Sequence, residues 1–251
     1  MTIYTCEDTL EGMMTCIYEV WAGKKGAQNV RLEVEPIFQQ EMFCEYIHVE
    51  ADADKTEKVI RSIQKKISFE AWCQVYYAAM SFEAGKLDAI YRFLRLGFAY
   101  GRKVTSMMAE EPVLEMLRLK RKVGNEMHFF REFVRFHSLN GSVYVSHIEP
   151  KCNVTAMVAE HFADRMPSEH WMIIDDQRCL AAVHPKDQKF YMTQLTKEEM
   201  EVLQKTEEQQ DIYTDLWKEF FVTIGIEQRK NPRCQRNLMP LWYRRHMTEM
   251  R

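Results

Sequence analysis

The sequence lacks the patterns that mark several large classes of protein. Its 251 residues contain no apolar run of about 18 residues, which an ordinary membrane span requires. The stretch from Met1 to Asp8 has neither the basic nor the apolar region of a signal peptide. The seven cysteines are scattered singly without a CxxC pair, so we expect no disulfide framework, cysteine zinc site or iron–sulfur cluster. These absences favour a protein of the reducing cytoplasm.

Common catalytic motifs are also missing. No HExxH, GxSxG, GxGxxG or P-loop pattern occurs, so zinc protease, hydrolase, dinucleotide and nucleotide-hydrolysing classes lack support. His128, His161 and Asp175 are suitable metal ligands by type, but no local spacing joins them, and we expect neither a metal nor a cofactor. The net charge of −3 produces no global basic field. Any binding of nucleic acid must therefore come from local patches.

Helical and strand-like periodicity alternate along the chain. The pattern predicts helices over 112–139, 154–166 and 197–225, and strands over 142–148, 171–175, 178–183 and 189–193. Short turn-like segments separate the last three strands, which indicates an antiparallel meander. We predict an α+β fold in which helices pack around a small, mostly antiparallel sheet. The chain divides into an N-terminal α+β region, 1–103, and a core with a basic tail, 104–251, although one continuous domain also fits.

A carboxylate interrupts the apolar face of the helix predicted over 112–139. Glu126 falls close in angle to Phe130 and Phe133, inside the apolar arc of the helical wheel. A charge in this position must be paired or perturbed, because burying an isolated charge is costly. Lys122 lies one turn earlier and is a structural partner at i, i+4 spacing. The alternative is a functional carboxylate.

Two further polar groups break the expected pattern. His161 and Arg165 fall on the inward face of the helix over 154–166. They belong either to a functional site or to the fold, as a hydrogen-bonded structural histidine and an arginine paired with a carboxylate. Asp175 ends a predicted strand and Arg178 begins the next, so the two also suit an ion pair that braces a turn. Three such anomalies suggest one polar centre.

The charge is unevenly distributed. Residues 226–251 contain seven Arg and Lys against two acids, with Trp242 and Tyr243 among them. Basic side chains beside aromatic rings can hold phosphates while the rings stack on bases. Arg229, Arg233 and Arg236 are therefore candidate contacts to DNA. The alternative is a solvated basic face that balances the acidic helix predicted from residue 197.

Four segments stand out together, namely KVGNEMHFFREFVRF (122–136), YVSHIEP (144–150), AEHFADRM (159–166) and WMIIDDQR (171–178), and the tail RKNPRCQRNLMPLWY follows them. In order and spacing the four segments resemble the signature of the domain of unknown function 4130 family, and the tail is similar to the family's ending. The opening IYTCEDTLEGMMTCIYEVW also resembles the family, so the likeness covers nearly the whole chain. The positions that match the signature are Glu126, His128, Arg135, His161, Arg165, Asp175 and Arg178.

The resemblance implies a biological setting and leaves the reaction open. Members are described as DNA repair or modification proteins encoded beside a radical-SAM protein, and some relatives are fused to a uracil-DNA-glycosylase-like domain. We expect a protein of DNA metabolism with a radical-SAM partner. The candidates are Glu126, His161 and Asp175 for catalysis, and His128, Arg135, Arg165 and Arg178, with the three tail arginines, for binding. The rival hypotheses are a non-catalytic partner of the radical-SAM protein and a small-molecule enzyme.

Overall fold

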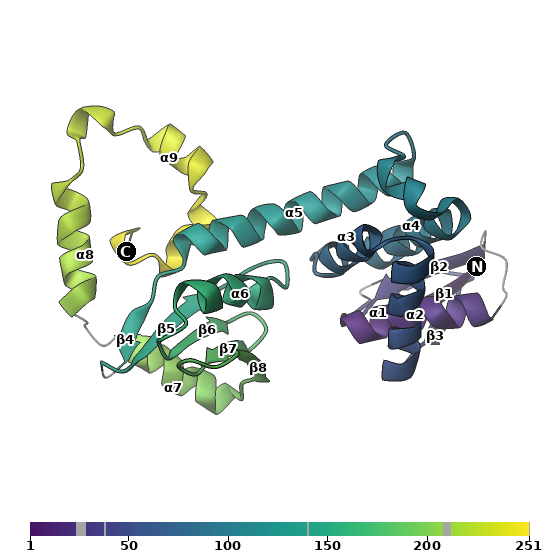
Figure 1. Ribbon diagram of the computed structural model, residues 1–251, viewed down its shortest axis with the longest axis horizontal. Coiled ribbons are helices and arrows are strands. Elements are labelled where there is room, and N and C mark those ends of the chain that lie inside the picture. Colours follow the sequence, from purple (N-terminus) through teal and green to yellow (C-terminus); the bar gives the residue numbers. More distant parts are fainter. Residues whose placement is uncertain (24–28, 38, 140, 208–211, 251) are drawn as a thin grey trace. The chain divides into compact units, whose positions relative to one another are not determined.

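The computed structural model describes residues 1–23, 29–37, 39–139, 141–207 and 212–250. The chain forms two compact units, unit 1 (Met1–Gly124) and unit 2 (Asn125–Arg251), so the division falls inside the long helix α5 (Glu111–Phe133) (Figure 1). The first half of α5 belongs to unit 1 because Val113, Met116 and Leu119 pack into its core. Every helix within the described residues is too short or too polar to cross a membrane.

Unit 1 contains a parallel sheet of three strands in the order β2-β1-β3. The strands are β1 (Thr2–Cys6), β2 (Val30–Val34) and β3 (Glu45–His48). The helix α1 (Leu10–Ala22) lies between β1 and β2 in the chain, in accord with the crossover that parallel pairing requires. The predicted α+β class is confirmed, and the structure adds this second, parallel sheet to the one that we expected.

The helices of unit 1 bury one continuous core against this sheet. They are α1, α2 (Ala53–Lys66), α3 (Phe69–Ala79), α4 (Lys86–Tyr100) and the start of α5, with the short 3₁₀ helix η2 (Gly101–Ser106) after α4. Asp52 and Ser68 cap α2 and α3, because each side chain accepts a hydrogen bond from a backbone N–H in the first turn. Ile17, Ile63 and Phe93 are fully buried in this core.

Unit 2 is built on a mixed sheet of five strands in the order β4-β5-β6-β7-β8. The strands are β4 (His137–Leu139), β5 (Val143–Ile148), β6 (Trp171–Asp175), β7 (Leu180–His184) and β8 (Tyr191–Gln194). The helices α6 (Thr155–Arg165) and α7 (Lys197–Glu207) cover opposite faces of the sheet (Figure 1). The predicted meander is confirmed, since β6, β7 and β8 pair antiparallel.

The pairing of β5 with β6 is parallel and positions the site described below. Ile148 is the register partner of Asp175, so the carboxyl ends of both strands meet at one edge of the sheet. The helix α6 connects the two strands, as parallel strands require. Polar residues that follow these strands are therefore brought together, as at the strand ends of other open sheets.

Two helix predictions need correction. The helix predicted over 112–139 ends at Phe133, and residues 137–139 form β4, whose backbone pairs with β5. The helix predicted over 197–225 corresponds to α7 and to α8 (Ile212–Thr223), while part of the predicted span, 208–211, lies outside the described residues. The basic tail then forms η3 (Glu227–Arg229), α9 (Pro232–Leu238), η4 (Leu241–His246) and η5 (Thr248–Met250).

Substitution of two helical glycines by alanine tests this packing, because one glycine is closely packed and the other is not. A Cβ at Gly12 would lie 2.8 Å from the backbone oxygen of Glu7, which cannot move without shifting the start of α1. A Cβ at Gly124, inside α5, would meet no heavy atom within 4 Å. We expect Gly12→Ala to lower the free energy of unfolding by about 1–3 kcal/mol. Gly124→Ala should raise it by about 0.5–1 kcal/mol, because alanine loses less backbone entropy in a helix.

Thermal unfolding followed by circular dichroism measures both changes. The two variants carry the same substitution, so a general effect of alanine would shift both midpoints in one direction. Equal shifts of the two midpoints would contradict the close approach at Gly12.

Candidate functional site

The loop after β5 is held by the carboxylate of Glu126. Its two oxygens accept hydrogen bonds from the backbone N–H groups of Lys151, at 2.9 Å, and Cys152, at 2.7 Å. Glu126 is 6% exposed, so both acceptors are used away from bulk water. The expected pair with Lys122 does not form, because the Lys122 ammonium contacts Glu83 instead. The carboxylate inside the apolar arc therefore shapes the loop.

Arg178 and Asp175 hold the same region from the other side. The Arg178 guanidinium donates to the carbonyl oxygens of Pro150, at 2.8 Å, and Lys151, and forms the predicted ion pair with Asp175 at 3.0 Å. Asp175 is fully buried and also accepts from the Thr155 hydroxyl and from the backbone N–H groups of Gln177 and Arg178. Burial raises the pKa of Asp175, and these donors offset part of the rise. Glu126, Asp175 and Arg178 are thus brought together around one loop.

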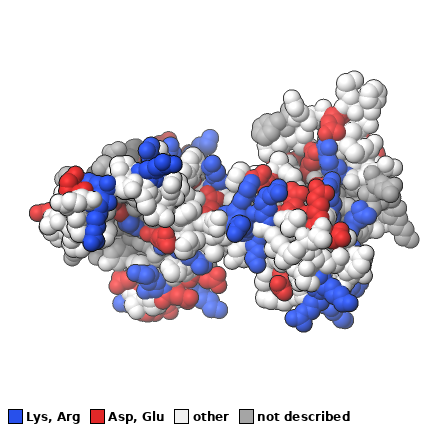
Figure 2. All heavy atoms as spheres, turned by 90° about the horizontal axis from the view of Figure 1, so that it is seen from above, with Lys and Arg blue, Asp and Glu red and all other residues white. Residues whose placement is uncertain are grey.

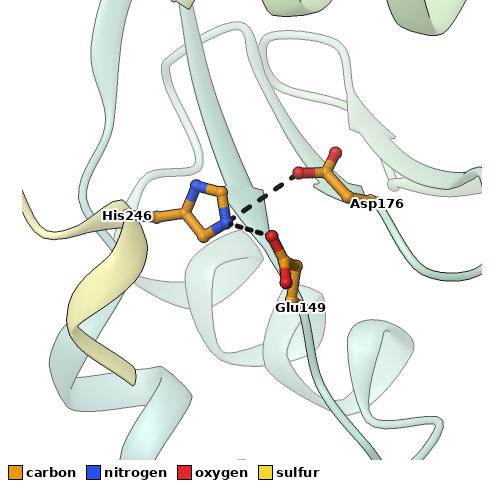
Figure 3. A group of neighbouring side chains, drawn as sticks. All are labelled: Glu149, Asp176 and His246. Atoms are coloured by element: carbon orange, nitrogen blue, oxygen red, sulfur yellow. Dashed lines mark hydrogen bonds and ion pairs between the residues drawn. The ribbon is translucent and has the colours of Figure 1, made fainter. Parts of the chain in front are cut away.

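The loop after β5 and the turn after β6 each present a carboxylate beside a histidine from the tail (Figure 3). Glu149 follows β5, Asp176 follows β6, and His246 comes from η4. The Nε2 atom of His246 lies 3.1 Å from Glu149 Oε1 and 3.9 Å from Asp176 Oδ2. The side chains of these three residues are 15–18% exposed, so solvent reaches the group only in part. We call Glu149, Asp176 and His246 the edge cluster.

A buried histidine supports the edge cluster from within the sheet. The Nδ1 atom of His147, on β5, lies 2.8 Å from Asp176 Oδ1, and the His147 side chain is fully buried. The ring of His147 stacks against the rings of His246 and His137, with centroids 6.2 and 6.3 Å apart. His147 therefore fixes one oxygen of Asp176 and leaves the other directed at His246.

The tail that carries His246 is anchored by contacts on both sides of it. Tyr243 packs against Phe129 and Phe130 of α5, with ring centroids 4.9 and 5.1 Å away. Its hydroxyl is partly buried, and this burial, together with the nearby Glu126 carboxylate, raises the pKa of Tyr243. The Trp242 indole N–H donates to the backbone oxygen of Glu149 at 3.0 Å. These contacts join η4 to the loop that Glu126 holds.

A second anchor follows His246. Arg135 binds Glu249 through both Nε and Nη2, with the shortest contact at 2.6 Å. Burial alone would raise the pKa of Glu249, but the Arg135 guanidinium holds it below the ordinary value. The Glu249 side chain is 2% exposed. Arg135, a predicted binding residue, thus holds the segment that positions His246.

The edge cluster has the composition of an acid–base centre or a metal centre. A histidine oriented by a carboxylate can hold or release a proton near neutral pH. The imidazole and the two carboxylates also offer one ligand atom each, all within 4.8 Å of one another. Among the described residues no other group of at least three such side chains comes this close.

The remaining predicted candidates lie away from the edge cluster. His161 is half-buried and Arg165 is exposed on α6, so the arginine is not inward as we predicted. The residues that α6 buries are Thr155, Met157, Val158, Ala159 and Phe162. Burial lowers the pKa of His161, and the charges of Arg131 and Arg165 lower it further. His128 is exposed and pairs with Glu132 at 3.1 Å. Arg229, Arg233 and Arg236 are exposed on the tail.

Four residues near the centre were missed by the sequence analysis. They are His147, Glu149, Asp176 and His246. The strand, helix and strand over 142–175 form a crossover unit, which would have predicted parallel pairing and a meeting of the polar residues after both strands. His246 carried no comparable signal, since it lies 97 residues from Glu149.

Comparisons with known proteins identify one family. The family model described as Domain of unknown function (DUF4130) matches residues 84–249, about two thirds of the chain. The chain belongs to this family. The match includes all four residues that form or support the site at the strand ends. A search of curated proteins gave no match.

The hydrogen bonds of Glu126 can be tested with a substitution that keeps its shape. In Glu126→Gln the amide nitrogen must face one of the two backbone N–H groups, donor against donor. We expect a loss of about 1–3 kcal/mol in the free energy of opening of this loop. The measurement is hydrogen exchange at the Lys151 and Cys152 amides. Glu132→Gln, an exposed change on the same helix, is the control, and equal exchange in both variants would contradict the assigned role.

The environment of His161 predicts a pH dependence. Its pKa lies below 6.5 in the folded chain, so the unfolded chain binds more protons between that pKa and 6.5. Stability therefore falls as the pH drops through this window. An NMR titration of the imidazole measures the pKa, and Arg165→Gln should move it upward by removing a like charge. Lys197→Gln, an exposed change on the face of the sheet opposite α6, serves as the control. An unchanged pKa of His161 in Arg165→Gln would remove the electrostatic explanation.

Proposed function

We propose that this DUF4130 protein acts in DNA repair or modification with a radical-SAM partner, and that it handles DNA at the edge cluster. The proposal places the protein in the cytoplasm, in keeping with seven cysteines that form no disulfide. One observation carries the proposal. The basic and aromatic tail also supplies His246, so groups suited to a nucleic acid and a group suited to chemistry share one short segment.

The contacts of the tail support DNA as the ligand. Arg245 is 63% exposed and pairs with Glu149, directly beside His246 in the chain. Trp242 is 41% exposed, and the Lys151 ammonium lies 5.0 Å from its ring centroid. A phosphate can bind such cations while a base stacks on the indole. A nucleotide held there would lie within reach of the edge cluster.

The wider charge distribution restricts binding to such local contacts. Figure 2 shows Lys and Arg interspersed with Asp and Glu over the visible face, as expected for a net charge of −3. A mixed surface gives little long-range attraction for a polyanion. We therefore expect modest affinity that depends on a few arginines and falls steeply with salt.

His246 is the side chain to which we assign proton transfer. Glu126 cannot serve, because both of its oxygens already accept backbone hydrogen bonds inside the protein. Glu149, 3.1 Å away, orients the His246 imidazole as carboxylates do in other acid–base pairs. Base handling in single-stranded or opened DNA suits this site better than sequence-specific readout, since no recognised DNA-reading motif occurs in the sequence.

A specific observation also favours the alternative role as a partner protein. The helix α8 exposes several large apolar side chains, namely Leu216, Trp217, Phe220, Phe221 and Val222. An exposed apolar strip of this kind is typical of a surface that binds another protein. In this alternative the protein binds the radical-SAM protein through α8 and supplies no catalysis.

The first test is fluorescence anisotropy with single-stranded, duplex and uracil-containing DNA at low and moderate salt. Replacing Arg229, Arg233 and Arg236 by Gln should weaken binding and reduce the slope of log affinity against log salt by about 2–3, because three phosphate contacts are lost. The control replaces the exposed Arg61, Arg92 and Arg102 of unit 1 by Gln, which changes the net charge equally.

The outcomes separate the two roles. Loss of binding in the tail variant alone supports direct contact with DNA. Equal losses in both variants, or no binding to any DNA, would refute that contact and favour the partner role. Co-purification with the radical-SAM protein, compared between the wild type and Leu216→Ser with Phe220→Ser, then tests α8. Val202→Ser, an exposed apolar change on α7, is the control for that experiment.

A further inference from the structure

We propose that the edge cluster binds a divalent cation of the first transition row, such as Mn²⁺, Fe²⁺ or Zn²⁺. The ligands are His246 Nε2, Glu149 Oε1 and Asp176 Oδ2. The inference deepens the proposed function and rests on it for the purpose of the metal. With a cation bound, His246 Nε2 would be a ligand and carry no proton, so the cation would take the place of the proton transfer that we assign to the metal-free His246. Binding of the metal itself can be measured without DNA.

The distances suit such an ion. Metal bonds of about 2.1 Å to nitrogen and oxygen place neighbouring ligand atoms roughly 3.0–3.4 Å apart. The Nε2 atom of His246 is 3.1 Å from Glu149 Oε1 and 3.9 Å from Asp176 Oδ2, and all three ligand atoms lie within 4.8 Å. Small side-chain rotations would therefore close the group around a cation. Figure 3 shows the three side chains pointing toward one another from three separate segments.

The buried His147 is a second, independent observation. Its Nδ1 atom bonds to Asp176 Oδ1, while its Nε2 atom has no hydrogen-bond partner among the described residues. A buried Nε2–H without a partner would be costly, so the proton belongs on Nδ1 and is donated to Asp176. This bond uses one oxygen of the carboxylate and turns the other toward His246. Carboxylates that bind metals are commonly oriented by such an outer hydrogen bond.

The ligand types select the class of cation. An imidazole nitrogen disfavours Mg²⁺ and Ca²⁺, which prefer all-oxygen sites, and the two carboxylates disfavour soft ions such as Cu⁺. Arg245 neutralises the other oxygen of Glu149, and its 63% exposure leaves the guanidinium room to turn away. Three protein ligands leave coordination positions open, which a phosphate oxygen of DNA can occupy.

The test titrates the chelator-treated full-length chain with MnCl₂ and follows free Mn²⁺ by electron paramagnetic resonance. We expect one Mn²⁺ per chain, with Mg²⁺ competing poorly. His246→Ala, Asp176→Asn and Glu149→Gln should each weaken binding by about tenfold or more. His128→Ala is the matched control, because His128 also lies 3.1 Å from a carboxylate, that of Glu132, but outside the cluster. The affinity of the His128→Ala variant for Mn²⁺ should equal that of the wild type.

A second measurement guards against variants that fold poorly. Co²⁺ bound to the wild-type chain should give visible absorption bands of a nitrogen and oxygen site, which His246→Ala loses while its circular dichroism is unchanged. Absence of Mn²⁺ binding and of Co²⁺ bands, or equal affinity in the wild type and the three cluster variants, would overturn the metal site. If DNA still binds in that case, the proposed function survives without a metal. Metal binding without DNA binding would support the site and refute the proposed function.

Discussion

The pair of hydrogen bonds from the Lys151 and Cys152 amides to Glu126 determines how the site is arranged. The loop after β5 leaves the sheet and must satisfy its backbone donors and acceptors without a neighbouring strand. The Glu126 carboxylate of α5 accepts hydrogen bonds from two of the backbone N–H groups, and the Arg178 guanidinium donates to the carbonyl oxygens of Pro150 and Lys151. A short irregular segment is thereby held between a helix and a strand. Glu149 stands at its start and owes its position to these bonds.

The sequence revealed this framework more clearly than the centre that it supports. Glu126 was visible because a carboxylate among Phe130 and Phe133 contradicts the apolar face of a helix. Asp175 and Arg178 were visible because a strand end followed by a turn places them side by side. A polar residue at a position where the local pattern predicts an apolar one can stabilise the fold or take part in chemistry, and the pattern alone does not distinguish the two roles.

The residues that sequence reasoning missed depend on tertiary structure. Glu149 and Asp176 each follow a strand in an ordinary polar context, and only the parallel pairing of β5 with β6 makes them neighbours. His246 lies in a segment whose composition predicted phosphate contacts and gave no sign of a long-range contact. The end of α5 at Phe133 and the strand β4 were likewise decided by pairing with β5, against helical periodicity that continues to residue 139.

The anchoring of the tail has a consequence for how the protein opens. His246 meets Glu149 across 97 residues of chain, and the surface of the segment before η4 is largely exposed. Such a contact closes a long loop at an entropic cost and can be broken while the strands remain paired. The centre can therefore come apart as a local event, at a lower free energy than unfolding of unit 2. Any ligand that needs His246 would shift that local equilibrium, and its affinity would include the free energy of docking the tail.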